Sequence, residues 1–470
     1  MKYLIFYIVL LYSPVIIAQG EVGYLFEEMP NDSLPNSSLR FHSSLKPFIR
    51  LPKQTKEFEI SGLGDLNLFQ NTHTNYKTGL GTELKGLIKN KFYYRISGIG
   101  GITEQFNFYV PRTYFYESTS QKKPVVYGDI RSRISFTPNH VFNFQVGLDH
   151  NFIGEGARSM LLSDYGTSYP FGQIRMNFWR IEYSILYQFL REQDNNRWEG
   201  KFSSSHHISF NAAKWLHFGI FESVVFQPKD TLLNRGFDAE YLNPFIFYRP
   251  QEYSLGSSDN VLLGVELSAN WKKHMFYGQF ILHEFNLGEL RKKSGWWANK
   301  FGGQAGVKGR FALGKHNFFY RVEYNFARPY TYAHLSEELN YGNQGSSLAH
   351  PYGANFMEML IELKWQQKKM YAKVFSNYYL RGLNKDGFNY GGNIYDPYIN
   401  RPDDYGHYIG QGKGFNGTKS VLTFGYQILK HGKLNAFIEN HFNFSTLNQP
   451  NPYTLVVGIR SQLWNDYRNY

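Results

Sequence analysis

The chain of 470 residues contains no cysteine. This absence excludes a disulfide framework, a thiolate metal site, a cysteine nucleophile and a lipid anchor on cysteine. Beyond the N-terminus there is no run of 18 consecutive apolar residues, so the sequence predicts no transmembrane helix. Mean hydropathy is also low, at −0.45.

The N-terminus begins MKYLIFYIVLLYSPVIIAQG, in which Lys2 precedes an apolar run over residues 3–17 and the small residue Ala18. That run is shorter than the roughly 20 residues that a membrane-spanning helix needs. We therefore predict a secretory signal peptide over residues 1–18, cleaved near Ala18, and an exported protein.

Aromatic residues are abundant: 18% of the chain is Phe, Tyr or Trp. Many of them belong to segments in which apolar and polar residues strictly alternate. Near the C-terminus, Tyr453, Leu455 and Val457 alternate with Thr454 and Gly458. Such alternation predicts strands with one apolar and one polar face, and the two faces cancel in any averaged hydropathy.

The alternation recurs along the chain and predicts an all-β fold, a transmembrane outer-membrane β-barrel of about 18 antiparallel strands with long extracellular loops. A soluble β-sandwich would carry a polar outward face, whereas these outward faces are apolar. The expected strands are 58–70, 80–89, 92–101, 127–136, 141–149, 172–179, 181–190, 202–210, 216–226, 261–270, 275–285, 303–313, 317–327, 355–365, 370–380, 422–428, 434–444 and 453–463.

Short connections alternate with long ones, as periplasmic turns alternate with extracellular loops in barrels of this kind. The link over 191–201 is of intermediate length. An even strand number places both chain ends in the periplasm. The predicted organisation is a signal peptide (1–18), an N-terminal periplasmic segment (19–56) and the barrel (57–470). The expected long loops are 102–126, 150–171, 227–260, 286–302, 328–354 and 381–417.

Charged residues of both signs fall on the inward faces. This mixture favours a cross-linked, filled lumen over a pore lined by one sign of charge. The net charge is +12, which points to outer-membrane lipid or lipopolysaccharide as partners rather than nucleic acid. The inward set comprises Arg131, Arg133, Arg175, Lys308, Arg310, Arg321, Lys364, Lys373, Arg460, Asp129, Glu182, Glu266, Glu323, Glu358, Glu362 and Glu439.

The long loops combine aromatic rings with planar polar side chains, a combination that suits sugars because their C–H faces stack and their hydroxyls need hydrogen-bond partners. The alternative is that the loops pack on one another over the barrel mouth. The candidate glycan-binding residues are Arg158, Tyr248, Arg249, Trp296, Trp297, Arg328, Tyr330, Tyr332 and His334.

No catalytic pattern is apparent. The pairs His206-His207 and His283-Glu284 lack a third ligand at metal spacing, and no GxSxG, P-loop or HExxH pattern occurs. We therefore expect no enzymatic activity, no metal and no cofactor.

The stretch NFIGEGARSMLLSDYGTSYPF (151–171) is predicted to be a structural element at the barrel rim. Gly154 and Gly156 would permit positive φ or close backbone approach. Arg158 would be free to pair with an acid such as Glu155 or Asp164, or with an acidic sugar. The apolar run 160–162 would tuck the loop into the barrel mouth.

Several ordered stretches resemble the capsule-assembly Wzi family, and most closely its Bacteroidota branch, which includes gliding-motility-associated RemB proteins. They are FIGEGARSMLLSDYGTSYP, YLNPFIFYRPQEYSLGSSDNVLLG, YGQFILHEFNLGEL with GWWANKFGGQAG, and ARPYTYAH followed by NYGNQGSSLAHPYGANF. The resemblance implies an 18-stranded barrel that binds surface or capsular polysaccharide and helps to retain a capsule. A porin-like channel and a component of gliding or secretion machinery, with outer-membrane protein partners, remain as alternatives.

Overall fold

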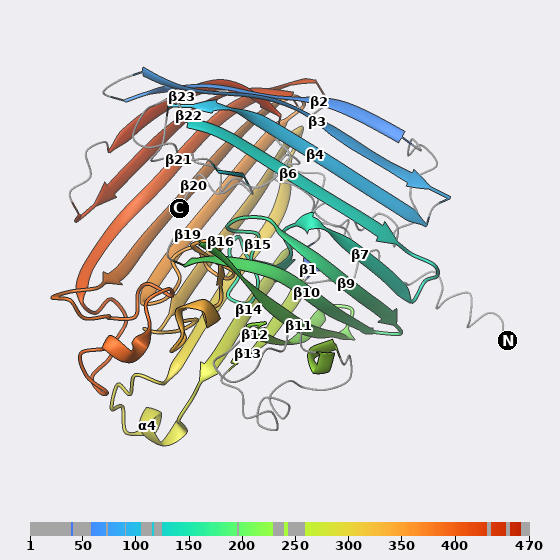
Figure 1. Ribbon diagram of the computed structural model, residues 1–470. Helices are drawn as coiled ribbons and strands as arrows, with labels where there is room; N and C mark the ends of the chain where they lie inside the picture. Colours follow the sequence, from blue (N-terminus) through green and yellow to red (C-terminus); the bar gives the residue numbers. More distant parts are fainter. Residues whose placement is uncertain are drawn as a thin grey trace.

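The chain forms a closed antiparallel β-barrel of 18 strands in the computed structural model (Figure 1). The structure describes residues 39–40, 58–71, 74–89, 91–104, 115–116, 125–194, 197–228, 239–242, 259–429, 434–447 and 452–461. Each barrel strand pairs with its neighbours in chain order, and the last strand pairs with the first, Asp65 opposite Arg460 through Gln70 opposite Leu455. The predicted fold class is confirmed.

Every predicted strand is present, and most bounds differ by one to five residues. Two strands begin earlier than predicted, at Thr74 instead of residue 80 and at Lys413 instead of residue 422. The barrel strands are β2 (Phe58–Gln70), β3 (Thr74–Ile88), β4 (Phe92–Thr103), β6 (Val125–Phe136), β7 (Phe142–Asp149), β9 (Tyr169–Phe178), β10 (Ile181–Asp194), β11 (Arg197–Ala213), β12 (Leu216–Phe226), β13 (Asn260–Trp271), β14 (His274–Glu284), β15 (Lys300–Leu313), β16 (His316–Ala327), β19 (Phe356–Gln367), β20 (Met370–Leu383), β21 (Lys413–Leu429), β22 (Leu434–Ser445) and β23 (Tyr453–Ser461).

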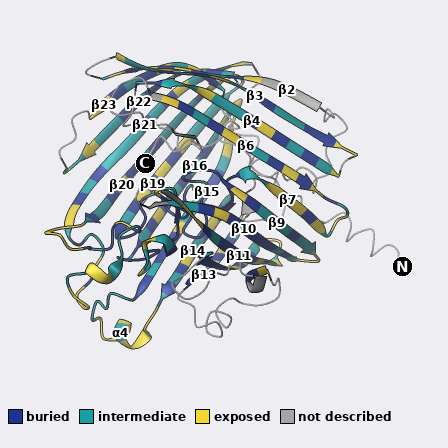
Figure 2. Cartoon of the chain, viewed as in Figure 1, coloured by how far each residue is buried: buried dark blue, intermediate teal, exposed yellow. Residues whose placement is uncertain are grey.

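Side chains alternate between the two faces of each strand, as Figure 2 shows in the bands of buried and exposed residues. The outward face is apolar: Leu80 is 78% exposed and Ile60 is 64% exposed. A bilayer offers the backbone no hydrogen-bond partners, so only a closed sheet with an apolar exterior can cross it with strands. The molecule is a transmembrane barrel of the outer-membrane type. Among the described residues, no helix combines the length and the apolar character that a bilayer span requires.

Most of the predicted inward charges are buried in the lumen, and many form ion pairs, whereas Arg310, Lys364 and Lys373 are half-buried. Arg95 Nε lies 2.7 Å from Glu83 Oε2, Arg460 Nη2 lies 2.6 Å from Glu439 Oε1, and Arg175 contacts Glu182. Because both signs lie on neighbouring strands, the pairs link the wall from the inside, as the mixed charges predict.

Tight turns occupy one end of the barrel and most long loops gather at the other, where Figure 1 shows α4 (Leu287–Arg291). Two expected connections differ. The link at 191–201 is not of intermediate length, because β10 and β11 stay paired out to Asp194 and Arg197. The loop expected over 381–417 spans only 384–412, because its ends continue the ladder between β20 and β21.

The connections between the barrel strands contain short secondary-structure elements. β5 (Phe115–Tyr116) pairs with β6, β17 (Gly342–Asn343) pairs with β18 (Ser346–Ser347), and β1 (Leu39–Arg40) pairs with β8 (Phe152–Ile153). The predicted signal peptide lies outside the described residues, as does the N-terminal segment apart from β1. Within the described residues, the single-turn 3-10 helices are Ala239–Leu242, Glu337–Leu339 and Tyr398–Asn400.

The topology predicts opposite accessibilities for two tag sites. An epitope inserted after Ile399, whose side chain is 70% exposed in the loop 384–412, should be labelled by antibody on intact cells. An epitope inserted after Lys368, in the turn between β19 and β20, should be labelled only after the outer membrane is permeabilised. The reverse pattern would show that the barrel has the opposite orientation.

Candidate functional site

The loop 150–168 lies inside the barrel and does not stay at its rim, which corrects the predicted position. Gln279, at the middle of β14, holds the loop at two points. Its Nε2 donates to the Ile153 carbonyl at 3.0 Å, and its Oε1 accepts from the Met160 backbone N–H at 2.8 Å. Gln304 on β15 donates to the Arg158 carbonyl at 3.0 Å.

A buried carboxylate on β16 holds the turn of this inserted loop. Glu323 accepts the backbone N–H groups of Ala157 at 2.6 Å and Arg158 at 3.2 Å. On β15, Lys308 Nζ lies 2.5 Å from Glu155 Oε2 and donates to the Glu155 carbonyl at 3.0 Å. The wall therefore supplies the hydrogen bonds that a loop in water would make to solvent.

Arg158 is buried, with only 2% of its surface exposed. Its Nη2 lies 3.6 Å from Glu358 Oε1 on β19, and its guanidinium lies over the Phe375 ring, 5.5 Å from the centroid. Arg158 therefore faces an acid, as expected, but this acid is Glu358 of the wall and neither of the two named examples, and Glu155 pairs with Lys308. The role of Arg158 as a glycan contact stays a prediction.

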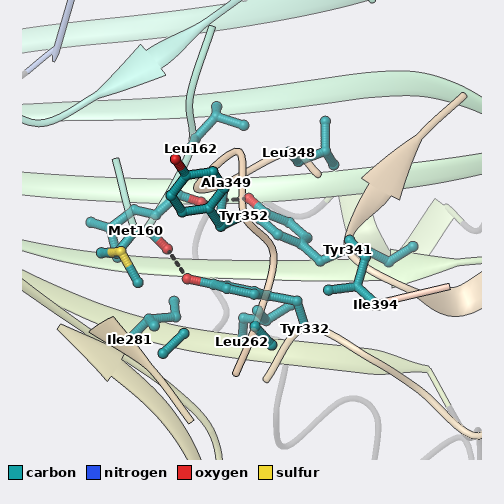
Figure 3. Close-up of a cluster of buried hydrophobic side chains, with 14 of the residues drawn as sticks. Met160, Leu162, Leu262, Ile281, Tyr332, Tyr341, Leu348, Ala349, Tyr352 and Ile394 are labelled. Atoms are coloured by element: carbon teal, nitrogen blue, oxygen red, sulfur yellow. Dashed lines mark hydrogen bonds between the residues drawn. The ribbon is translucent and has the colours of Figure 1, made fainter. Parts of the chain in front are cut away.

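The apolar part of the inserted loop forms a core within the lumen, as predicted. Met160, Leu161 and Leu162 are fully buried. The loop 328–355 covers them: Tyr332 OH donates to the Met160 carbonyl at 2.8 Å and Tyr341 OH donates to the Leu161 carbonyl at 2.9 Å (Figure 3). Burial raises the pKa of both phenols, so they stay neutral donors.

A second layer of aromatic rings lies above this core, where three long loops meet. Trp297 packs against Tyr398 at 4.7 Å between centroids, and Trp296 packs against Tyr405 at 5.0 Å. Arg401 stacks over Trp297 at 4.1 Å. Tyr405 is 55% exposed. We call these five residues the rim aromatic cluster.

Cations and a neutral histidine surround the rim aromatic cluster. Lys300 Nζ lies 3.9 Å from the Tyr398 ring centroid and 2.8 Å from Glu284 Oε1. Arg328 Nε donates to the Asn299 carbonyl at 2.8 Å, and burial lowers its pKa. Burial, with help from Lys300, lowers the pKa of His334 to about 4, so this imidazole is neutral at pH 7. Its Nδ1 accepts the Ser336 N–H at 3.2 Å, which leaves Nε2 as a donor.

The candidates chosen from the sequence therefore fall into different places. Trp296, Trp297, Arg328 and His334 meet at the rim. Tyr330 and Tyr332 are fully buried and hold the loops in place from below. The Tyr330 hydroxyl donates to the Asn389 carbonyl at 2.8 Å. Tyr248 and Arg249 lie outside the described residues.

The sequence did not single out Tyr398, Arg401 and Tyr405, which are members of the rim aromatic cluster. Their loop is visibly rich in Tyr, Asn and Asp, but nothing in its spacing says which side chains face the tryptophans. No three His, Asp or Glu side chains in the described ranges lie close enough to hold a metal ion.

Comparison with known proteins places the fold. No protein-family model and no curated protein sequence matches the chain. The structure of Wzi from Escherichia coli, described as a carbohydrate-binding β-barrel involved in group 1 capsule assembly, is similar with a TM-score of 0.58 and 12% identity, over 87% of this chain and 85% of that one. At this identity the likeness shows the fold alone.

Two further solved structures share the barrel less closely. OprD from Pseudomonas aeruginosa gives a TM-score of 0.45 at 7% identity, covering 86% of this chain and 96% of that one. OccAB4 from Acinetobacter baumannii gives 0.47 at 8% identity, covering 87% and 99%.

The two glycines of the inserted loop provide a test of its packing. Gly154 has φ of 122°, and a Cβ on Gly156 would lie 2.6 Å from the Arg158 carbonyl oxygen and 2.5 Å from Glu323 Oε2. Gly156→Val should therefore destabilise the barrel by about 1–3 kcal/mol. The measurement is the temperature at which the heat-modifiable band shifts on a gel.

The matched control is Gly172→Val on β9, where a Cβ would meet nothing within 4 Å. This variant should keep the wild-type transition temperature. Equal transition temperatures for the two variants would mean that the loop does not pack against the wall as described.

Proposed function

We propose that this protein is a non-enzymatic outer-membrane barrel that binds surface polysaccharide and assists its assembly or attachment as capsule or exopolysaccharide. The observation that carries the proposal is the rim aromatic cluster. It presents rings and a stacked guanidinium at the end of the barrel that bears the long loops, and the neutral imidazole of His334 lies beside it.

The chemistry of the cluster suits a sugar chain. Exposed rings such as Tyr405 offer apolar faces for the C–H surfaces of a pyranose. His334 and Arg401 add donors at the edges of these rings, and a guanidinium can also take the carboxylate of an acidic sugar. Arg401 is itself held by Asp404, with Nε to Oδ1 at 2.7 Å, so its plane is fixed before a ligand arrives.

The likeness to Wzi supports the same function, since that barrel is described as carbohydrate-binding. The finer assignment, to the Bacteroidota branch with its RemB-like members, rests on the sequence stretches quoted above. A role in gliding or secretion machinery is the alternative, because exposed Ile399, Tyr405 and Tyr408 would also suit a protein partner.

Glycan binding predicts a loss of retention when rings are removed from the cluster. In cells that lack the native gene, the variant Trp296→Ala/Tyr405→Ala should release polysaccharide that the wild type retains. Each ring is worth about 1 kcal/mol, so affinity should fall about tenfold or more. The ratio of cell-bound to shed polysaccharide is the readout.

Leu287→Ala/Leu290→Ala serves as the matched control, since both leucines are exposed in a loop at the same end but lie outside the cluster. The control should retain polysaccharide as the wild type does. Full retention by the ring variant would contradict the proposal and favour a protein partner.

A porin-like function predicts steady ion conductance through the barrel, whereas a lumen filled by the inserted loop predicts none. The full chain in planar bilayers should show no large, steady conductance, because the loops 150–168 and 328–355 pack into a buried core across the lumen. Replacing residues 151–167 by a short Gly-Ser linker should open a pore, since a barrel of 16–18 strands encloses a water-wide channel. Steady conductance of the unmodified chain would support the porin alternative.

A further inference from the structure

The turns at the end of the barrel opposite the long loops carry charge of one sign. The described residues of these turns contain no Asp or Glu; they are 89, 91, 137–141, 179–180, 214–215, 272–273, 314–315 and 368–369. Most of these turns contain Lys or Arg, and exposed examples are Lys89, Lys91, Arg180, Lys272, Lys273, Lys315, Lys368 and Lys369.

These cations lie beside large aromatic side chains on the outer wall. Trp179, Trp215 and Trp271 are 75%, 56% and 59% exposed. Arg180 lies over the Trp179 ring at 5.5 Å and Lys272 lies over the Trp271 ring at 4.9 Å. Farther round the same end, Lys369 lies 5.8 Å from the ring of Tyr426, which is 49% exposed.

The aromatic side chains belong to the outward face of the strands. Trp271 continues the outward set Val265 and Leu267 on β13, and Trp179 packs against outward Phe210 at 6.0 Å. Arg180, Lys272 and Lys369 therefore sit at the outer perimeter of the barrel, where the apolar wall ends, and not over the lumen. Trp and Tyr at such a level mark the boundary between hydrocarbon and headgroups.

The opposite end of the barrel carries charges of both signs. Its long loops contain acidic residues, among them Glu289, Glu337 and Asp404. Lys292 pairs with Glu289 there, and Arg401 pairs with Asp404. In the part of the chain that the structure describes, Lys273, Lys315 and Lys369 have no such acidic partner.

We propose that the basic turns form a ring that binds the anionic headgroups of phospholipids in the membrane leaflet at this end. Each Lys or Arg near an anionic surface attracts it, and the neighbouring rings hold the turn at headgroup depth. An acidic protein would bind equally well to cations that face the lumen axis or project beyond the wall. The perimeter position, continuous with the lipid-facing wall, fits the lipid. The inference is independent of the glycan site at the other end.

The test measures which lipids stay with the barrel. The full chain is equilibrated in detergent with phosphatidylcholine and phosphatidylglycerol, and the ratio of the two lipids retained after purification is compared with the bulk ratio. The wild type should enrich phosphatidylglycerol about fivefold or more, the equivalent of about 1 kcal/mol from a single charge. The enrichment should fall as salt is added.

Two variants, each with three charges removed, test whether the enrichment depends on the charges of the turns or on the total positive charge of the protein. Lys273→Gln/Lys315→Gln/Lys369→Gln, on three successive turns, should lose most of the enrichment while keeping a heat-modifiable, folded barrel. Arg291→Gln/Lys292→Gln/Lys293→Gln, at the opposite end, should keep it. Wild-type lipid at the bulk ratio would overturn the proposal and leave an acidic partner as the occupant. An equal loss in both variants would overturn it too, because the ring would then have no special role.

Discussion

The backbone hydrogen bond is the constraint on which the rest of this structure depends. A strand in hydrocarbon cannot leave N–H and C=O groups unpaired, so the sheet must close on itself, as it does where β23 (Tyr453–Ser461) meets β2 (Phe58–Gln70). Closure with 18 strands makes a cylinder whose lumen is wide enough for a water channel. The inside of the cylinder then has to be lined or filled.

This barrel is filled by its own loops. The inserted loop brings both apolar residues and backbone polar groups into the lumen, and each kind has a partner there. Met160 to Leu162 pack beneath Tyr332 and Tyr341. The hydroxyls of these two tyrosines donate hydrogen bonds to the carbonyls of Met160 and Leu161. Gln279, Gln304 and Glu323 form hydrogen bonds from the wall to further backbone groups of the loop. Since a buried carboxylate or amide without a partner is costly, these contacts are mutually dependent.

Filling the lumen also shapes the two ends of the barrel. At one end the loops are supported from below, so the rings of Trp296, Trp297 and Tyr398 are held in fixed positions over a buried core. At the other end the connections are too short to fold back, and their side chains can only reach outward or along the wall. The end with the long loops therefore presents a surface for an external ligand. The end with the short turns presents a ring of cations at the bilayer boundary.

The sequence by itself determined the strand number, the strand positions and the inward charges, because alternation is a property of neighbouring residues and needs no knowledge of distant ones. It also indicated that Gly154 and Gly156 mark a constrained turn and that the apolar run 160–162 is buried.

Only the tertiary structure decided where that loop goes and what it touches. Arg158 faces Glu358, and Tyr398 faces Trp297, across long sequence separations. No local pattern encodes such pairs, because a loop side chain takes whichever partner the closed wall places opposite it. The curvature of the whole sheet sets that position.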